Sequence, residues 1–402
     1  MDEPLTILVA ARDEADRIGA TVVTLRRDFP GAEVIVVDGA SRDETAQRAE
    51  EAGAVVIRLT RTGKGEALSA GERAAPPGSL LLCDADLRGS LAPLTDGSAD
   101  LAIAAFVRRT GGGFGIAKRV ARELIRVRTG FSPREPLSGQ RRLNERARAA
   151  CFPLAPGFGC EVRMTIDAAR AGLAVSEVEL DLEHRATGRD AAGFLHRGRQ
   201  LLDALLAAGP LAVNHRGLRL PLVGWTVGIR RDAAVAAVAA LGLADDLWSG
   251  EERGIRAHLA SGRTTGVLKL AGIPLVGLAA TRSLSGGILV AGCANLINQL
   301  DTKPGRALKT YLAAALVLRA PSGLAVLLLP YDLRERVMLG DAGSNALGAL
   351  LGLKSVERVH GWGRWAAALA VVGLNVLGER RSLGAIIERT PFLREVDAWG
   401  RP

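Results

Sequence analysis

Short apolar runs alternate with helical stretches over the first half of the chain. Each run has the length of a single strand, and the stretch after the first run places Ile18, Val22 and Leu25 at helical spacing. The apolar runs are residues 5–11, 33–37, 54–57 and 80–83. Continuous apolar strands separated by helices of about ten residues are typical of a parallel sheet that is covered on both faces. We therefore predict an α/β domain over residues 1–205.

The composition changes from about Leu205 onward. Residues 264–300 contain two charged side chains, and residues 363–378 contain one. Several apolar segments here are shorter than the ~20 residues that cross a bilayer, but they are numerous and rich in Gly and Ala, which suits close packing of membrane helices. We predict an all-α, multi-helix transmembrane domain over residues 206–380 and a cytoplasmic tail over residues 381–402. The alternative is an all-helical soluble domain with an unusually apolar surface.

Bulk composition narrows the range of partners. The 402 residues carry a formal net charge of +9, and only 4% of them are aromatic. Runs of five Lys or Arg are absent and aromatic side chains to stack on bases are scarce, so we expect no nucleic acid partner. The positive charge fits an anionic membrane surface or anionic substrates. The four cysteines show no metal-binding spacing. A strand-like run begins at residue 5 without a preceding signal peptide, so we expect the first domain in the cytoplasm.

Polar residues gather where the predicted strands of the first domain end, at the edge where such sheets bind ligands. Asp84 and Asp86 form an Asp-x-Asp, whose hard oxygen ligands suit Mg²⁺ or Mn²⁺ held against a diphosphate. Asp38 is placed to bond a base or ribose, and Lys64 between two glycines offers a cation to phosphate. Singly, an Asp-x-Asp is often a solvated turn and an Asp after a strand a helix cap. Their order along the chain favours a functional site.

Residues 1 to about 200 resemble family 2 glycosyltransferases of the GT-A fold, most closely the glucosyl-3-phosphoglycerate synthase branch. The matching segments are residues 11–14, 36–45, 63–68, 84–87, 137–141, 156–161 and 183–185. The resemblance implies that Asp86 and His184 bind the metal and that Glu161 contacts the sugar or acceptor. The residues implied in binding a nucleotide-sugar donor are Arg12, Glu14, Asp38, Lys64, Asp84, Asp86 and Arg141. The chain departs from the family at Asp13, where Asn is usual, and in a basic, Gly-rich segment over residues 108–128, so the acceptor cannot be carried over.

Acidic residues recur beside the apolar segments of the second half, where charge is costly and marks functional sites. They form three groups: Asp245 with Asp246, Asn298 with Asp301, and Asp341. Converging carboxylates repel one another without a cation, and a Mg²⁺ among them could take a diphosphate. Each acid taken singly could instead be a helix cap or an interfacial charge.

These groups resemble the motifs of phospho-N-acetylmuramoyl-pentapeptide transferase and the polyprenyl-phosphate N-acetylhexosamine-1-phosphate transferases. The match runs from residue 214 to about residue 352. The resemblance implies catalytic roles for Asp245, Asp246, Asn298, Asp301 and Asp341, with Asp341 also at the metal. Asp301 is followed by Thr302 rather than Gly, the late His-rich loop is missing, and so are the first membrane helices, so the domain is a shortened version.

Together these features predict a multi-pass cell-membrane enzyme of bacterial envelope biosynthesis with its first domain in the cytoplasm. It would take a sugar from a nucleotide-sugar donor, with Mg²⁺ or Mn²⁺ as cofactor, and meet polyprenyl phosphate or a lipid-linked acceptor. The second domain would be a phosphoglycosyltransferase, which would make the enzyme bifunctional. Two alternatives remain: a second domain that is only a lipid-binding anchor, and a non-catalytic scaffold in a cell-wall complex.

Overall fold

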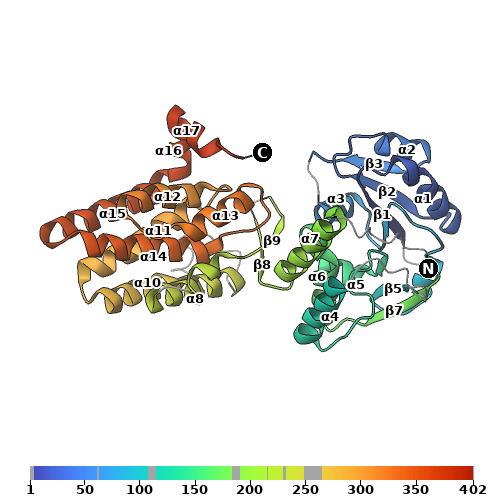
Figure 1. Ribbon diagram of the computed structural model, residues 1–402, viewed down its shortest axis with the longest axis horizontal. Helices are drawn as coiled ribbons and strands as arrows, with labels where there is room; N and C mark the ends of the chain where they lie inside the picture. Colours follow the sequence, from blue (N-terminus) through green and yellow to red (C-terminus); the bar gives the residue numbers. More distant parts are fainter. Residues whose placement is uncertain are drawn as a thin grey trace. The chain divides into compact units, whose positions relative to one another are not determined.

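The chain folds into two compact units in the computed structural model (Figure 1). The structure describes residues 4–60, 63–106, 115–182, 191–214, 216–229, 232–248 and 265–401. Unit 1 comprises residues 1–209 and 217–219, and unit 2 comprises residues 210–216 and 220–402. The predicted boundary after residue 205 falls inside a helix, α7 (Ala191–Ala207). Residues 381–402, expected as a separate tail, belong to unit 2.

Strands and helices alternate in unit 1, as the sequence pattern predicts. The strands are β1 (Leu5–Ala11), β2 (Glu33–Asp38), β3 (Val55–Arg58), β4 (Ser79–Asp84), β5 (Leu101–Phe106), β6 (Arg141–Leu143) and β7 (Val175–Leu180). The helices before α7 are α1 (Ala15–Asp28), α2 (Thr45–Glu51), α3 (Lys64–Ala74), α4 (Ile116–Thr129), α5 (Glu145–Cys151) and α6 (Cys160–Arg170).

Seven strands form one sheet in the order β3-β2-β1-β4-β6-β5-β7. The pairs among β1 to β4 are parallel, whereas β6 runs antiparallel to both β4 and β5. Within the parallel part, Ala11 pairs with Asp38 and Ala10 pairs with Asp84. The carboxyl ends of β1, β2 and β4 are therefore level, which brings their polar residues to one edge of the sheet. The mixed α/β, GT-A-like architecture predicted for this unit is confirmed.

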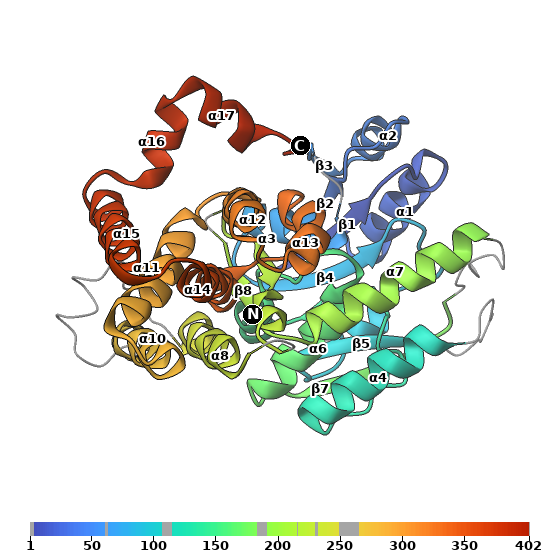
Figure 2. The same cartoon turned by 60° about the vertical axis from the view of Figure 1, so that its left-hand side comes forward.

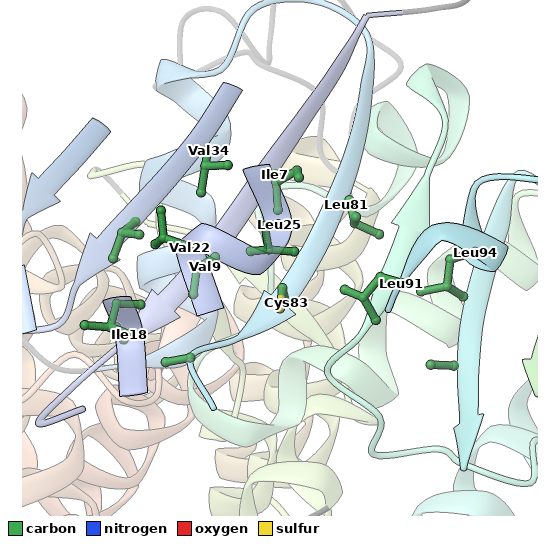
Figure 3. Packing of buried hydrophobic residues seen from close by; sticks show 14 of the residues in the cluster. Ile7, Val9, Ile18, Val22, Leu25, Val34, Leu81, Cys83, Leu91 and Leu94 are labelled. Atoms are coloured by element: carbon green, nitrogen blue, oxygen red, sulfur yellow. The ribbon is translucent and has the colours of Figure 1, made fainter. Parts of the chain in front are cut away.

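Apolar side chains are buried on both faces of this sheet, which explains the continuous apolar runs. On one face Ile7 and Val9 of β1 pack with Ile18, Val22 and Leu25 of α1 (Figure 3). On the other face lie Leu8, Ile35, Leu80 and Leu82, together with residues of α3 and α6. Burying each such side chain contributes about 1.5–3 kcal/mol, so this double-sided core fixes the strand ends that carry the polar edge.

Helices make up nearly all of the described part of unit 2 (Figure 2). They are α8 (Ala233–Trp248), α10 (Thr265–Thr281), α11 (Leu284–Leu300), α12 (Arg306–Leu318), α13 (Gly323–Leu333), α14 (Gly340–Arg358), α15 (Gly361–Arg381), α16 (Leu383–Arg389) and α17 (Pro391–Ala398). Two short strands, β8 (Leu211–Val213) and β9 (Arg219–Pro221), pair with each other. Helix α14 is the most deeply buried, and it packs against α8, α11 and α12.

Among the residues that the structure describes, no helix is both long enough and apolar enough to cross a membrane. The prediction of a helical second domain is confirmed, whereas the prediction of transmembrane helices is not.

Candidate active site

The loops that follow β1 and β2 are held together by hydrogen bonds at the carboxyl edge of the sheet. The backbone N–H of Asp13 donates to Ser41 Oγ over 2.9 Å, and that of Glu14 donates to Thr45 Oγ1 over 2.8 Å. Asp38 is buried at the end of β2 and accepts hydrogen bonds from the backbone and the hydroxyl of Ser41. Asp38 is the residue that the sequence predicts to hydrogen-bond a base or ribose. Its carboxylate is thus held in place between the two loops.

Arg12 and Glu14 lie on this same loop but in different settings. Arg12 is exposed, with its Nε 3.5 Å from Asp13 Oδ2. Glu14 precedes α1 and accepts a 2.7 Å hydrogen bond from Arg17. Their roles in donor binding stay predictions, and the weak surface pair leaves Arg12 able to turn toward an anion.

A cation buried between two carboxylates forms the centre of the site. Lys64 begins α3, and its Nζ lies 2.6 Å from Asp84 Oδ1 at the end of β4 and 2.8 Å from Glu161 Oε1 in the first turn of α6. Although burial alone would lower the pKa of Lys64, these carboxylates raise it well above its usual value. Lys64 is therefore a permanent cation, and three segments far apart in the sequence meet at its ammonium group.

The loop before β6 presses closely on this ion cluster. A Cβ at Gly139 would lie 2.5 Å from Asp84 Oδ2 and 2.6 Å from Lys64 Nζ, so any larger residue there would displace these two side-chain ends. The Gly-containing motif thus closes one side of the cluster.

Arg141 lies beneath this loop rather than at the edge of the sheet. Its guanidinium is fully buried and donates to the Ser138 and Pro136 carbonyls and to Thr165 Oγ1. Burial lowers its pKa, and the Glu161 carboxylate partly opposes this. These contacts occupy the guanidinium, so Arg141 holds the loop in position, and its role in donor binding stays a prediction.

The metal ligands predicted in unit 1 are only partly described. Asp86 is half-buried, two residues beyond the end of β4, whereas His184 lies outside the described residues. Within the described part of the chain, no three His, Cys, Asp or Glu side chains converge to hold a metal ion. The chemistry of Asp86 nevertheless fits a hard divalent cation whose remaining ligands are diphosphate oxygens and a further side chain.

Comparison with known proteins identifies the family. Residues 6–141 match the model of "Glycosyl transferase family 2". A glucosyl-3-phosphoglycerate synthase of Mycolicibacterium paratuberculosis is 30% identical over 241 residues, which are 50% of this chain and 71% of that protein. The chain belongs to glycosyltransferase family 2. Glycosyltransferase AglJ of Haloferax volcanii is also 30% identical, over 200 residues that cover 47% of this chain and 66% of that protein.

A solved structure of a relative shows a bound donor. The glucosyl-3-phosphoglycerate synthase of Mycobacterium tuberculosis in complex with Mn²⁺, UDP-glucose and phosphoglyceric acid is 26% identical; the match covers 54% of this chain and 86% of that one, with a TM-score of 0.44. The family match over residues 6–141 and the 30% identical relative show that unit 1 is a family 2 glycosyltransferase domain that uses a nucleotide-sugar donor.

Unit 2 of this family 2 glycosyltransferase contains a separate acidic cluster. Lys269 of α10 places its Nζ 2.7 Å from Asp245 Oδ2 and also donates to Asp341 at the start of α14. Asp246 accepts two 2.9 Å hydrogen bonds from the backbone N–H groups of Asp341 and Ala342. The predicted convergence of Asp245, Asp246 and Asp341 is present in the structure.

The charge on this cluster is balanced within the protein. Burial, and next the Asp341 carboxylate, raise the pKa of Asp246 to about 7. Burial also raises the pKa of Asp341, against the opposing effect of Lys269. The Lys269 ammonium bridges Asp245 and Asp341, and the described residues offer no group of three metal ligands. In this structure the Asp341 carboxylate is a partner of Lys269, and its role in metal binding stays a prediction.

Asn298 and Asp301 lie at the end of α11, near this cluster. The Ser344 hydroxyl lies 3.4 Å from Asn298 Oδ1, which is a weak contact. Burial, and next the Asp332 carboxylate, raise the pKa of Asp301 well above its usual value. Both predicted residues thus lie beside α14, where Asp301 is half-buried.

Lys269 was not predicted as a site residue. Its signal was present in the sequence, because it is one of two charged residues between positions 264 and 300. A lone cation in an apolar helix requires a counter-ion, which makes it a partner for acids elsewhere in the chain.

Proposed function

We propose that this protein is a membrane-associated glycosyltransferase of bacterial cell-envelope biosynthesis. Unit 1 takes the sugar from a nucleotide-sugar donor, and unit 2 binds polyprenyl phosphate or a lipid that carries the acceptor. The observation that carries the proposal is the Lys64 cluster with Asp84 and Glu161, which lies at the carboxyl ends of the strands in a family 2 domain.

The residues of unit 1 have separable tasks in this reaction. Asp38 holds the nucleoside, and Asp86 with His184 would hold the divalent cation. The cation, when bound, neutralises charge on the departing nucleoside diphosphate. Lys64 holds the Asp84 and Glu161 carboxylates side by side, and Glu161 is the group that would accept hydrogen bonds from hydroxyl groups of the sugar or acceptor. The acceptor oxygen forms its bond to the anomeric carbon as the bond to the diphosphate breaks.

An apolar cavity in unit 2 supports a lipid ligand. It has a volume of about 410 Å³ and lies among α10, α11 and α15. Its lining is largely Leu, Ile, Val, Pro and Gly, and Lys269 with three Asn side chains supplies the polar part. A cavity that is apolar along its length and polar at one end, where Lys269 is paired with Asp245 and Asp341, matches an isoprenoid chain that carries a polar group at its end.

The surface of unit 2 supports membrane association. Large apolar side chains are exposed on several of its helices, among them Leu316, Val317, Leu327, Trp362 and Leu369. Apolar surface of this extent marks a protein or membrane contact. We propose the cell membrane as the location, with unit 1 in the cytoplasm.

The test is donor turnover by the purified full chain in detergent. UDP-, GDP- and ADP-sugars are supplied with Mg²⁺ or Mn²⁺, with and without undecaprenyl phosphate. Release of a nucleoside diphosphate that is abolished by Asp86→Asn supports the proposal and names the donor. Absence of release with every donor would instead support the scaffold alternative.

A second function is favoured by the acidic cluster of unit 2. Asp245, Asp246 and Asp341 converge at one point, as in enzymes that attack a diphosphate. A phosphoglycosyltransferase would release a nucleoside monophosphate in a lipid-dependent reaction. Loss of that product, with the diphosphate product retained, in Asp341→Asn would establish a second activity. Absence of the monophosphate in the wild-type chain would leave unit 2 as the lipid-binding anchor.

A further inference from the structure

Helix α17 near the C-terminus has an apolar side that nothing in the described part of unit 2 covers. Phe392, Val396 and Trp399 recur at helical spacing and are exposed to 72%, 48% and 72%. At 100° per residue these three side chains fall within about 60° of one another. They form a single face, which we call the α17 apolar face.

The other side of α17 is fixed by a buried ion pair. Arg306, at the start of α12 and 2% exposed, donates to both oxygens of Asp397 over 2.9 and 2.8 Å. Arg401 donates to both oxygens of the same carboxylate. Lys309 donates to the backbone carbonyls of residues 396, 397 and 399. A bidentate pair of this geometry holds the helix in one orientation, so the exposure of the apolar face is imposed by the fold.

Helix α16 joins this arrangement. Its Glu388 lies 2.8 Å from Lys303 and 3.1 Å from Arg306. Both helices therefore dock on residues 303–309, the segment that follows Asp301. They project from the helices of unit 2 above α12 and α15 (Figure 1). The α17 apolar face is thus presented at the end of unit 2 where Asp301 lies.

Exposed basic residues belong to the same segment of the chain, and the one on α17 lies on the side of the helix opposite this face. Arg380 and Arg381 end α15, Arg389 ends α16, and Arg394 lies within α17; all four are exposed. The acids of α16 and α17 that could neutralise them are partly committed, because Glu388 and Asp397 pair with Lys303 and Arg306. Glu395 of α17 stays exposed. A helix with a Trp and a Phe on one side and an Arg on the other has the composition of helices that lie in the headgroup layer of a bilayer.

We propose that α17 binds an anionic lipid surface through the α17 apolar face, with the arginines on phospholipid headgroups. The inference rests on the proposed function only in placing unit 2 at a membrane. It adds which element lies in the interface, and it places the Asp301 end of unit 2 at the level of lipid phosphates.

The experiment reads the environment of single positions in the full-length chain. The four native cysteines are buried, and burial raises the pKa of their thiols, so they resist labelling in the folded protein. Trp399→Cys is labelled with an environment-sensitive fluorophore, and Ala398→Cys, exposed on the flank of the same helix, is the matched control. Vesicles contain phosphatidylcholine alone or an equal mixture with phosphatidylglycerol.

With the mixed vesicles, we expect the emission maximum of the fluorophore at position 399 to shift to shorter wavelength. Lipids that carry a quencher near the headgroup should quench this emission, while the fluorophore at position 398 responds weakly in both measurements. Arg389→Gln with Arg394→Gln should lower the preference of the chain for mixed over neutral vesicles by about 30-fold, at about 1 kcal/mol for each arginine. Vesicle-bound protein with an unchanged label at 399 would overturn the inference. A shift without vesicles that grows with protein concentration would assign the face to a second copy instead.

Donor turnover measured on the same samples separates the two proposals. A position-399 shift without any product leaves the lipid contact standing and refutes the enzyme function. Product formation without the shift does the reverse.

Discussion

Removing the cation from the Lys64 cluster should destabilise unit 1 strongly. The variant Lys64→Met keeps most of the side-chain volume but leaves Asp84 and Glu161 facing each other without a counter-charge. In the wild-type chain the Lys64, Asp84 and Glu161 side chains are 19%, 33% and 6% exposed, so water can compensate Asp84 but hardly Glu161. Removing one partner of a buried ion pair costs about 3–5 kcal/mol. Because Asp84 is partly solvated, we expect about 3 kcal/mol.

Scanning calorimetry of the full chain measures this loss. The transition of unit 1 is the one that a nucleoside diphosphate with Mn²⁺ shifts upward. A loss of about 3 kcal/mol lowers its midpoint by roughly 6–12 °C, at about 2–4 °C for each kcal/mol in a unit of this size. The double variant Lys64→Met/Glu161→Gln removes the stranded buried carboxylate as well, and it should recover more than half of the loss.

The outcome of this cycle decides the argument. A drop of less than about 1 kcal/mol in Lys64→Met would mean that the cluster is screened like a surface pair. A double variant no more stable than the single one would mean that Lys64 acts through contacts other than Glu161. Either result would refute the picture of a buried, charge-balanced cluster.

Three further outcomes follow from the structure. Asp86→Asn should abolish the dependence of donor binding on Mn²⁺, while the same change at Asp28, at the end of α1 far from the carboxyl ends of the strands, should not; calorimetric titration with UDP checks both. Lys269→Met leaves the acids that it bridges without a cation, so it should lower the midpoint of unit 2, and Mg²⁺ should restore the variant more than the wild type. Asp397→Asn should destabilise the docking of α17 by about 3 kcal/mol at pH 7. Burial of the Asp397 carboxylate raises its pKa, but hydrogen bonds from Arg306 and Arg401 outweigh this effect and hold the pKa well below its usual range. The contribution of this carboxylate to the docking of α17 is therefore complete above about pH 4 and is lost as the pH falls further. Limited proteolysis should cleave the tail of the variant faster than that of the wild type at pH 7, and the two rates should become equal in strong acid.

The sequence predicts the first unit well because its signals are local. Continuous apolar runs require burial on both faces of a sheet, and parallel strands bring Asp38 and Asp84 to one edge whatever the loops do. The ion cluster itself is not local: Lys64, Asp84 and Glu161 meet only because α3, β4 and α6 converge. Arg141 shows what a sequence motif cannot predict. The motif places this arginine near the edge of the sheet where ligands bind, but it does not indicate that the guanidinium points beneath the loop.

The second unit is harder to predict for a physical reason. Apolar helices reveal composition but not which faces meet, so the acids at 245, 246 and 341 are visible in the sequence while their counter-ion is not. The tail was expected to be a separate cytoplasmic element. Its docking depends on Arg306 and Asp397, which are 91 positions apart and belong to segments without a recognisable motif.

The position of β6 has a consequence for how the protein is made. Strand β6 lies between β4 and β5 in the sheet, although both precede it in the chain. A nascent chain that has just completed β4 therefore carries an open, apolar strand edge until residue 143 leaves the ribosome. At typical bacterial and eukaryotic synthesis rates, about 60 residues take roughly 3–12 s. An unpaired edge of this kind recruits other strands, so the newborn chain is most vulnerable to aggregation, and most dependent on chaperones, during that interval.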